Sequence, residues 1–483
     1  MNEITEAKPR VSTLGFTNDQ QKAYEELIEF INSPYNKNDT KRALIGAAGT
    51  GKTYLLKALI TNSNLSHSVI GLAAPTHKAC RILAESIDNL VNVTTLQSDL
   101  GLRLNFDVDS FDINNPPFDP KGECKLYNYK VYIIDEASMI PSGLTQFLEN
   151  KCKAYECKVI YVGDESQLNP VNERHSTAFN GIKTHKLTQI VRQGDDNPIS
   201  YLLELLRNDI KNKTFKFLDY IACNTNKHNS DNTKGYVVYK PYYFKNQICS
   251  TFNNKELETN IDYVKVIAYT NNCVNYWNKT IRNVIIENSD RAIITKNDLF
   301  ISYTTIVNQF NECIIKNSEE YIVKDVVNYT HPTYNLKGYM VRFQAIHGGM
   351  VTPPLFVLNH YDISNISAYM KISNNLIDIA KTANNRVKSA KWKDYYKFKE
   401  SCLLLTNVYK ADGKILYTRD IDYGFALTAH RAQGSTFDTV FVDVNNIVFD
   451  SAGQVYSNIE EINRRLYVAC SRAKNKLYLL YGH

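Results

Sequence analysis

The segment that most constrains the fold is Gly46-Ala47-Ala48-Gly49-Thr50-Gly51-Lys52-Thr53, which fits the pattern G-x-x-x-x-G-K-[ST]. It follows an apolar run, Arg42 to Ile45, and precedes a helix-like stretch, Tyr54 to Thr61. In that context the backbone N–H groups of such a loop surround phosphate oxygens. We expect Lys52 to reach the β and γ phosphates and Thr53 to bind Mg²⁺. The segment therefore predicts an α/β fold with a nucleoside triphosphate site.

Further short apolar runs, each bounded by turn residues, predict a parallel sheet around this loop: Ser68 to Ala74, Lys130 to Ile134 and Lys158 to Val162. The same signature returns late in the chain and predicts a second α/β sheet: Val264 to Tyr269, Thr439 to Val444 and Lys476 to Leu480. Between them, roughly residues 300 to 420 are Tyr-rich. Short alternating segments there, such as Tyr339 to Ile346 and Leu355 to Leu358, predict a small antiparallel β module.

Two stretches interrupt the alternation of strands and helices. Leu102 to Asn128 contains Asn114-Asn115-Pro116-Pro117 and is predicted to be an inserted hairpin. Cys223 to Gly235 is rich in Asn, Ser, Thr and Lys and is predicted to be a surface loop.

Composition excludes several classes of protein. The chain has 483 residues, 43% hydrophobic and 22% charged, and this length suits about three domains at ~150 residues each. No run approaches the ~20 apolar residues of a membrane span, and Met1 to Ser12 lacks the apolar stretch of a signal peptide. We therefore expect a cytoplasmic protein that does not contact a membrane. The ten scattered cysteines are expected to be reduced core residues. The net charge of +6 is only weak support for a polyanionic partner.

Two acidic residues follow the predicted strand Lys130 to Ile134, in the segment Val131-Tyr132-Ile133-Ile134-Asp135-Glu136. Downstream of a phosphate-binding loop, Asp135 is expected to hold Mg²⁺ and Glu136 to orient or deprotonate the attacking water. A third strand leads into Gly163 to Leu168, where Gln167 could sense the γ-phosphate. Arg192 and Arg472 are the candidate cations for the transition state, although most arginines simply lie on the surface.

In order along the chain, these elements resemble the superfamily 1 helicases. The matching segments are Phe16 to Gln20 (the Gln motif), Ala73 to Ala79 (motif Ia), Asp135 to Ser138 (motif II), Gly163 to Pro170 (motif III), Ala426 to Thr436 (motif V) and Tyr467 to Ala473 (motif VI). The forms A-P-T-H-K-A and L-T-A-H-R-A-Q-G-S-T resemble the 5′→3′ branch, superfamily 1B, with its RecD-like enzymes. The compact length and an aromatic segment, Lys391 to Tyr396, resemble its Dda-like phage members. One departure is Gln97, where the family usually has His.

The resemblance implies two RecA-like P-loop motor domains, with an inserted β-hairpin and an inserted small SH3-like β module. The implied domains are 1–195 (first motor domain, hairpin at about 102–128), 196–300 with 421–483 (second motor domain), and 301–420 (the β module with its tower and hook). ATP and Mg²⁺ would bind between the motor domains. The resemblance adds Gln20, Gln433 and Gly434 to the nucleotide site.

The resemblance also implies a path for single-stranded DNA across both motor domains. The candidate contacts are Pro75, Thr76, His77, Lys78, Thr428, His430 and Ser435. Hydroxyls after strands cap helices more often than they bind ligands, so the capping alternative stays open. In the inserted hairpin, Phe106, Phe111 and Phe118 are candidates for a pin that separates strands, or they cover the motor domain. Trp392 and its Tyr neighbours would brace the β module or contact DNA.

The sequence thus predicts an ATP-dependent DNA helicase that moves 5′→3′, in phage replication or recombination. Two alternatives stay open, a translocase that displaces bound proteins without unwinding and a DNA-binding replication accessory factor that ATP switches. Expected partners are single-stranded DNA, single-strand/duplex junctions, a single-strand-binding protein and replisome or recombination proteins. A monomer in the host cytoplasm is expected. Because +6 is small for a DNA-binding protein, basic residues should gather along one strand-binding channel.

Overall fold

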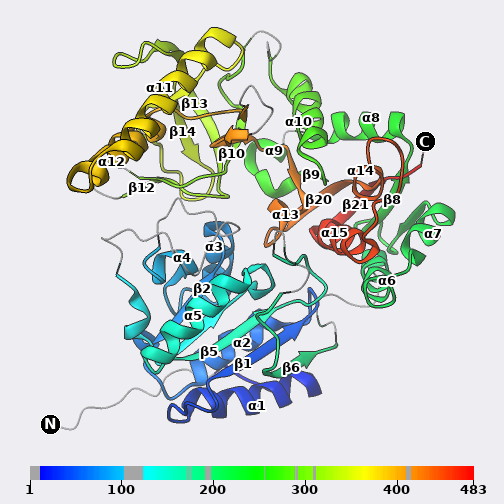
Figure 1. Ribbon diagram of the computed structural model, residues 1–483. Helices are drawn as coiled ribbons and strands as arrows, with labels where there is room; N and C mark the ends of the chain where they lie inside the picture. Colours follow the sequence, from blue (N-terminus) through cyan, green and yellow to red (C-terminus); the bar gives the residue numbers. More distant parts are fainter. Residues whose placement is uncertain are drawn as a thin grey trace. The chain divides into compact units, whose positions relative to one another are not determined.

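The computed structural model describes residues 11–102, 123–170, 173, 176–189, 191, 197–254, 256–287, 289, 292–307, 312–409 and 415–482. The chain forms two compact units (Figure 1). Unit 1 comprises residues 1–240 and 429–483, and unit 2 comprises residues 241–428. The domain bounds predicted from the sequence stay a prediction.

Unit 1 contains a six-stranded, wholly parallel sheet in the order β3-β2-β4-β5-β1-β6. Its strands are β1 (Lys41–Gly46), β2 (Ile70–Ala74), β3 (Val93–Thr95), β4 (Val131–Ile134), β5 (Lys158–Gly163) and β6 (Lys183–Leu187). The four apolar runs predicted around the phosphate-binding loop are thus strands of one sheet. Because these strands are parallel, their carboxyl ends meet along one edge, where open α/β sheets bind ligands.

Helices cover both faces of this sheet. They are α1 (Asn18–Asn32), α2 (Lys52–Asn62), α3 (His77–Ser86), α4 (Leu96–Asp99) and α5 (Ser142–Ala154), with short 3-10 turns η1 (His67–Val69), η3 (Lys125–Asn128) and η4 (Ala137–Met139). Alternation along β4 explains the two layers. Ile133 packs with α1, α2 and α3, whereas Tyr132 and Ile134 pack with α5 on the other face.

A second set of strands in unit 1 comes from both of its chain segments, the end of 1–240 and the segment 429–483. β20 (Phe437–Asp443) and β8 (Gly235–Tyr239) both pair in parallel with β21 (Ala473–Leu480), and β7 (Asn226–His228) pairs antiparallel with β8. The accompanying helices are α6 (Pro198–Asn212), α7 (Lys216–Cys223), α13 (Ala429–Ala432), α14 (Val444–Val448) and α15 (Ile459–Ser471). The stretch Cys223 to Gly235, predicted to be only a loop, thus contains an edge strand.

Unit 2 is built around an antiparallel sheet in the order β15-β14-β13-β10-β18. Its strands are β10 (Leu299–Ser302), β13 (Glu320–Thr330), β14 (Lys337–Ala345), β15 (Leu355–Leu358) and β18 (Ile421–Tyr423). Three small pairs accompany it, namely β11 (Ile306–Val307) with β12 (Cys313–Ile315), β16 (Val408–Tyr409) with β17 (Ile415–Tyr417), and the parallel strands β9 (Val264–Ala268) and β19 (Ala426–Thr428). Unit 2 also contains α8 (Pro241–Phe252), α9 (Glu256–Thr259), η5 (Ile261–Tyr263) and α10 (Asn271–Ile285).

Two long helices complete unit 2, α11 (Ile363–Thr382) and α12 (Asn385–Ser401). They run side by side and form a helical hairpin (Figure 1). Phe398 of α12 contacts Tyr369 of α11, with ring centroids 5.1 Å apart, and both are buried in a cluster that includes Phe356 and Leu358 of β15. The alternating pattern of this block predicts strands and gives no sign of the two helices.

Three further observations concern the described residues. None of their helices is long and apolar enough to cross a membrane. The ten cysteines form no disulfides, and the prediction that they are core residues is wrong for half of them, since four are half-buried and Cys223 is exposed. The described residues include no group of three or more His, Cys, Asp and Glu side chains arranged to hold a metal ion.

Candidate nucleotide site

The phosphate-binding loop joins β1 to α2 at the carboxyl edge of the parallel sheet. Gly49 and Gly51 have φ of 85° and 80°, a left-handed conformation that favours glycine. A Cβ on Gly51 would lie 2.4 Å from Nε2 of Gln20, so only glycine fits there. The loop leads directly into the first turn of α2, which begins at Lys52. There, unpaired backbone N–H groups and the helix dipole favour an anion.

The Lys52 side chain folds against this loop. Its ammonium donates hydrogen bonds to the carbonyl oxygens of Gly46, at 2.6 Å, and Ala47, at 3.1 Å. Thr53 is half-buried in the first turn of α2. The Thr50 hydroxyl also donates to the Ala47 carbonyl, at 2.9 Å, and so closes the turn. The Lys52 ammonium is thus held against the loop in which it is expected to bind phosphate.

Gln20 connects α1 to the phosphate-binding loop. Its Oε1 accepts a hydrogen bond from the Thr17 backbone amide at 3.0 Å. Its backbone amide donates one to the Thr17 hydroxyl at 3.3 Å, and the two bonds make a capping box at the start of α1. Its Nε2 donates to the Thr50 carbonyl at 2.9 Å, and the side chain is 2% exposed. The residue chosen for its resemblance to the Gln motif therefore fixes the loop by direct contact.

Asp135 and Glu136 follow β4 at the same edge of the sheet. Oδ1 of Asp135 accepts a hydrogen bond from the Glu136 amide at 2.9 Å, and Glu136 has a left-handed backbone, with φ of 52°. Burial, then repulsion from Asp135, raises the pKa of Glu136 to about 7, although Arg472 and Lys52 oppose the shift. Burial also raises the pKa of Asp135, against the attraction of Lys52. A carboxyl group with a pKa near 7 is suited to accept a proton at neutral pH.

Tyr467 of α15 links two loops of the sheet edge. Its hydroxyl donates a hydrogen bond to Oδ2 of Asp164, at 2.8 Å, and accepts one from the Ala48 amide, at 3.4 Å. Asp164 directly follows β5, and its side chain is buried. One buried hydroxyl therefore connects motif III to an amide of the phosphate-binding loop. Nothing in the sequence singled out Tyr467 or Asp164 beyond their places in motifs VI and III.

Arg472, the residue after α15, is buried near the carboxylates. Its Nη1 donates to the Ser435 carbonyl at 3.1 Å and its Nε to the Val468 carbonyl at 3.0 Å. Burial lowers the pKa of Arg472, and the charge of Glu136 opposes the shift. The predicted cation and the predicted base thus influence each other electrostatically.

The side chains of Gln433 and Arg464 hold the motif III loop through three hydrogen bonds. Gln433 donates a hydrogen bond from its Nε2 to Oε1 of Gln167, at 2.7 Å, and both side chains are buried. Gly434 follows with φ of 75°. Arg464 of α15 donates to the backbone carbonyls of Glu165 and, at 2.8 Å, of Gln167. Sequence reasoning missed Arg464, because an arginine inside a helix carries no signal of such a contact.

The predicted DNA contacts fall in several environments. Thr76 is the N-cap of α3, and its hydroxyl accepts a hydrogen bond from the Ala79 amide at 3.2 Å, so the capping alternative describes this geometry. The Lys78 ammonium lies 5.0 Å from the centre of the Phe437 ring. His77 begins α3, Pro75 follows β2, and Thr428 ends β19 in unit 2.

The remaining DNA candidates lie in unit 1, near α15. Burial, then Arg465, lowers the pKa of His430 to about 4, so this imidazole is neutral at pH 7. Ser435 is 2% exposed. Arg192 and the pin candidates Phe106, Phe111 and Phe118 lie outside the described residues.

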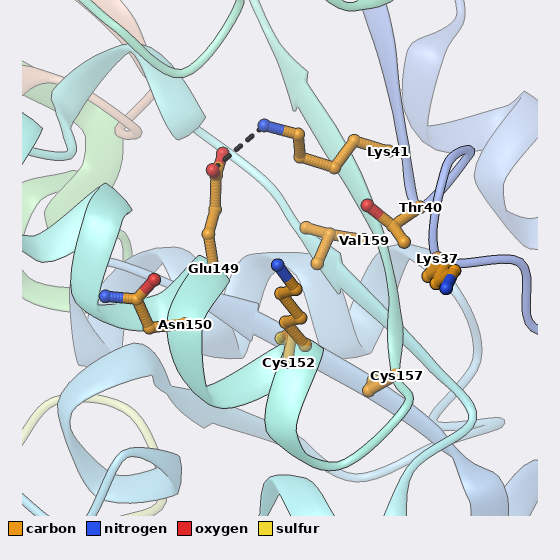
Figure 2. A pocket seen from close by; sticks show the side chains of 9 residues that line it. Lys37, Thr40, Lys41, Glu149, Asn150, Cys152, Cys157 and Val159 are labelled. Atoms are coloured by element: carbon orange, nitrogen blue, oxygen red, sulfur yellow. Dashed lines mark hydrogen bonds and ion pairs between the residues drawn. The ribbon is translucent and has the colours of Figure 1, made fainter.

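A pocket of about 280 Å³ lies elsewhere on unit 1 (Figure 2). Its lining includes Lys41 at the start of β1 and Val159 near the start of β5, and Lys41 forms an ion pair with Glu149 at 2.9 Å. These are the amino ends of parallel strands, whereas the phosphate-binding loop follows the carboxyl end of β1. The pocket is therefore separate from the nucleotide site.

The parallel sheet, the glycine-rich loop and the half-buried carboxylates Asp135 and Glu136 define a P-loop nucleoside triphosphatase. Residues 17–222 match the family profile described as an AAA domain, and residues 423–480 match the UvrD-like helicase C-terminal domain. These two matches support a superfamily 1B helicase, of the Pif1- and RecD-like group of ATP-driven DNA helicases. The more specific resemblance to Dda-like members stays a prediction.

The chain is also similar to individual proteins and solved structures. An uncharacterized protein of Acanthamoeba polyphaga mimivirus is 24% identical over 96% of this chain and 99% of its own length. The ATP-dependent RecD2 DNA helicase of Deinococcus radiodurans is 32% identical, over 32% of this chain and 20% of its own. The Pif1 helicase from Bacteroides, solved with ADP-AlF3 and single-stranded DNA, is 17% identical with a TM-score of 0.50, over 96% of this chain and 92% of the other. The predicted α/β fold with RecA-like motor architecture is confirmed, while the pin and the SH3-like module stay predictions.

Proposed function

We propose that this helicase uses ATP hydrolysis to move 5′→3′ along single-stranded DNA and to unwind the duplex ahead. The observation that carries the proposal is the placement of Glu136 among Asp135, Lys52 and Arg472, which act together on its pKa. A carboxyl group with a pKa near 7, between two cations and beside a second carboxylate, suits a base that activates water for attack on a phosphate. The 5′ to 3′ direction is supported only by the form of motifs Ia and V.

The proposed roles follow the geometry of unit 1. The loop amides from Gly46 to Thr53 bind the phosphates, Lys52 neutralises their charge and Glu136 takes the proton from water. Gln167 senses the γ-phosphate, and Arg472 with Arg192 balances the charge of the transition state. Gln20, Gln433 and Gly434 complete the nucleotide site.

Mg²⁺ is the metal that this chemistry implies, and the residues present fit it. The Thr53 hydroxyl and the Asp135 carboxylate supply hard oxygen ligands of the kind that Mg²⁺ prefers. The pKa of Asp135 is raised because the cost of taking its charge out of water outweighs the attraction of Lys52, and a bound cation would add positive charge there. When bound, Mg²⁺ neutralises charge on the phosphates. Asp135 and Thr53 then hold it, and Glu136 stays available for water.

For the DNA path we propose Pro75, Thr76, His77, Lys78, Thr428, His430 and Ser435. A motor that moves on any sequence must contact mainly the backbone. Pro75 and Thr76 directly follow β2 and Thr428 ends β19, and ends of strands are places where amides and hydroxyls can bind phosphate. The neutral His430 suits a hydrogen bond better than a charge contact. Phe106, Phe111 and Phe118 remain the proposed pin.

The biological setting is also part of the proposal. We propose a viral role in DNA replication or recombination, in the host cytoplasm; the mimivirus relative supports the viral origin alone. We propose that the protein acts as a monomer on single-stranded DNA and on junctions. A single-strand-binding protein and replisome or recombination proteins would be its partners.

Two measurements test the proposal together. ATP hydrolysis is measured with and without oligo-thymidine, and strand separation is measured on duplexes with a 5′ or a 3′ tail. We expect strong stimulation by the oligonucleotide and unwinding of the 5′-tailed duplex alone. Unwinding only from 3′ tails would overturn the direction. Stimulated hydrolysis without unwinding would favour a translocase that displaces proteins, and slow unstimulated hydrolysis would favour the accessory factor that ATP switches.

A further inference from the structure

The surplus positive charge of the chain is concentrated on one hairpin of unit 2. Residues 363 to 401, which form α11 and α12, contain eight basic and three acidic residues, a net charge of +5. The whole chain carries +6, from 56 basic and 50 acidic residues. The remainder is therefore almost neutral. The sequence predicts basic residues along a single-strand channel, but most of the surplus lies on these two helices.

The cations of α12 are arranged as a stripe, which we define as Arg386, Lys393 and Lys397. They are separated by seven and four residues, so at 100° per residue they lie within about 40° of one another around the helix. The stripe extends about 16 Å along the axis. All three side chains are exposed. Phe398, about 120° around the helix from Arg386, is buried against α11 and fixes which face is turned outward.

Acidic residues compensate little of this charge. α12 contains two of them, Asp394 and Glu400. Asp394 forms an ion pair with Lys391, at 3.4 Å, which is not part of the stripe. Glu400 lies one turn beyond Lys397, at the end of the helix, so at most one carboxylate faces three cations. Like charges on a fixed helical surface repel one another, and a row of cations in excess is suited to a regular polyanion.

We infer that the stripe on α12 is a binding surface for the phosphate backbone of duplex DNA. The inference rests on the proposed function as a DNA helicase, for which DNA is the polyanion that the chain meets. A duplex presents about one phosphate per 1.7 Å of its axis, and the stripe therefore spans several of them. The inference does not depend on the proposed direction of movement.

The aromatic residues of α12 favour duplex over single-stranded DNA. Sites for single strands offer open ring faces on which bases stack. Here the ring of Trp392 lies 5.8 Å from that of Tyr395 and 6.2 Å from that of Tyr396, and the two tyrosine rings lie 5.3 Å apart, so the three rings pack against one another. Tyr396 is 38% exposed, but it lies about 80° around the helix from Arg386. The three residues of the stripe therefore offer charge and no ring face, which suits a duplex whose bases are already paired.

The test compares two triple variants. Arg386→Ala, Lys393→Ala and Lys397→Ala together remove the stripe. The control, Lys37→Ala, Lys153→Ala and Lys211→Ala, removes three exposed lysines of unit 1 and changes the net charge equally. Fluorescence anisotropy measures binding of a blunt-ended duplex and of oligo-thymidine at several salt concentrations. Hydrolysis of ATP stimulated by oligo-thymidine is measured in parallel, and far-UV circular dichroism checks the fold.

We expect the stripe variant to bind the blunt duplex at least about tenfold more weakly at low salt. The slope of log K against log salt should fall by about 2 to 3, since each lost phosphate contact contributes ~0.9. Affinity for oligo-thymidine and the stimulated ATPase should stay within about twofold of wild type, and the control should match wild type throughout. Unchanged duplex binding, an equal loss for oligo-thymidine, or an equal loss in the control would overturn the inference. If wild type lacks stimulated ATPase, the proposed function fails, whereas duplex binding still tests the stripe.

Discussion

The Tyr467 hydroxyl donates a hydrogen bond to the buried carboxylate of Asp164 at 2.8 Å, although the two residues are 303 positions apart. The same hydroxyl accepts the Ala48 amide of the phosphate-binding loop. Tyr467 lies five residues before Arg472, and Arg464 of the same helix holds the motif III loop. α15 therefore connects the candidate arginine to both the loop and motif III through side chains that do not themselves react.

Replacing Tyr467 with Phe tests this connection. The variant leaves a buried carboxylate short of one hydrogen bond, so the free energy of unfolding should fall by about 1 to 3 kcal/mol. The turnover number for ATP should fall by roughly 10- to 100-fold, because small displacements of catalytic groups are costly. The KM for ATP should not rise, since the Ala48 amide becomes free for phosphate. Steady-state kinetics and thermal unfolding measure these changes.

Tyr242→Phe is the matched control, because Tyr242 is highly exposed. It should leave both stability and turnover unchanged. A Tyr467→Phe enzyme with normal turnover but a raised KM would show that the hydroxyl serves nucleotide binding instead.

Lys52→Ala should abolish ATP hydrolysis while leaving the fold intact. The hydrogen bonds of the Lys52 ammonium go to carbonyls of its own loop, so little packing is lost. Loss of one such electrostatic donor costs about 10²- to 10³-fold in turnover. ATPase assays with oligo-thymidine measure the effect, and circular dichroism checks folding. Lys57→Ala is the control, because it breaks only a surface ion pair with Asp88, worth less than ~1 kcal/mol.

Appreciable DNA-stimulated turnover in the Lys52→Ala enzyme would contradict the assignment of this loop as the motor site. Normal activity is expected from Lys57→Ala.

The pKa of Glu136 predicts how hydrolysis depends on pH. A base must be deprotonated to act, and the pKa of this carboxyl is about 7 in the free protein. The value of kcat/KM for ATP should therefore fall as pH drops below about 7, approaching a tenfold loss per pH unit. Glu136→Gln should lower the turnover number at least ~100-fold, and its kcat/KM should not fall in this way below about pH 7. If the binding of a non-hydrolysable ATP analogue weakened equally below about pH 7, the group that titrates would be on the nucleotide and not Glu136.

Local patterns predicted the strands that carry the candidate nucleotide site, because each motif is short and follows its own strand. β15 has the predicted bounds, Leu355 to Leu358, and β4 begins one residue after the predicted start. The contacts of Tyr467 and Arg464 could not be predicted, since they join segments about 300 residues apart and depend on tertiary packing. α12 was not predicted for another reason. Its Lys- and Tyr-rich sequence has few apolar residues on one face, so its helical periodicity is weak.

A fully buried ion pair in unit 2 gives the last prediction. The Lys265 ammonium of β9 lies 2.5 Å from Oε1 of Glu320, the first residue of β13, and the side chains are 0% and 1% exposed. Removing one partner strands a buried charge, so Lys265→Met or Glu320→Leu alone should lower the free energy of unfolding by about 3 to 5 kcal/mol. The double variant Lys265→Met/Glu320→Leu strands no charge and should recover most of that loss. Chemical denaturation of all four proteins measures the coupling. Additive losses in the double variant would mean that the two charges are stabilised by other groups, and the pair would then have no special role in holding β9 to the antiparallel sheet.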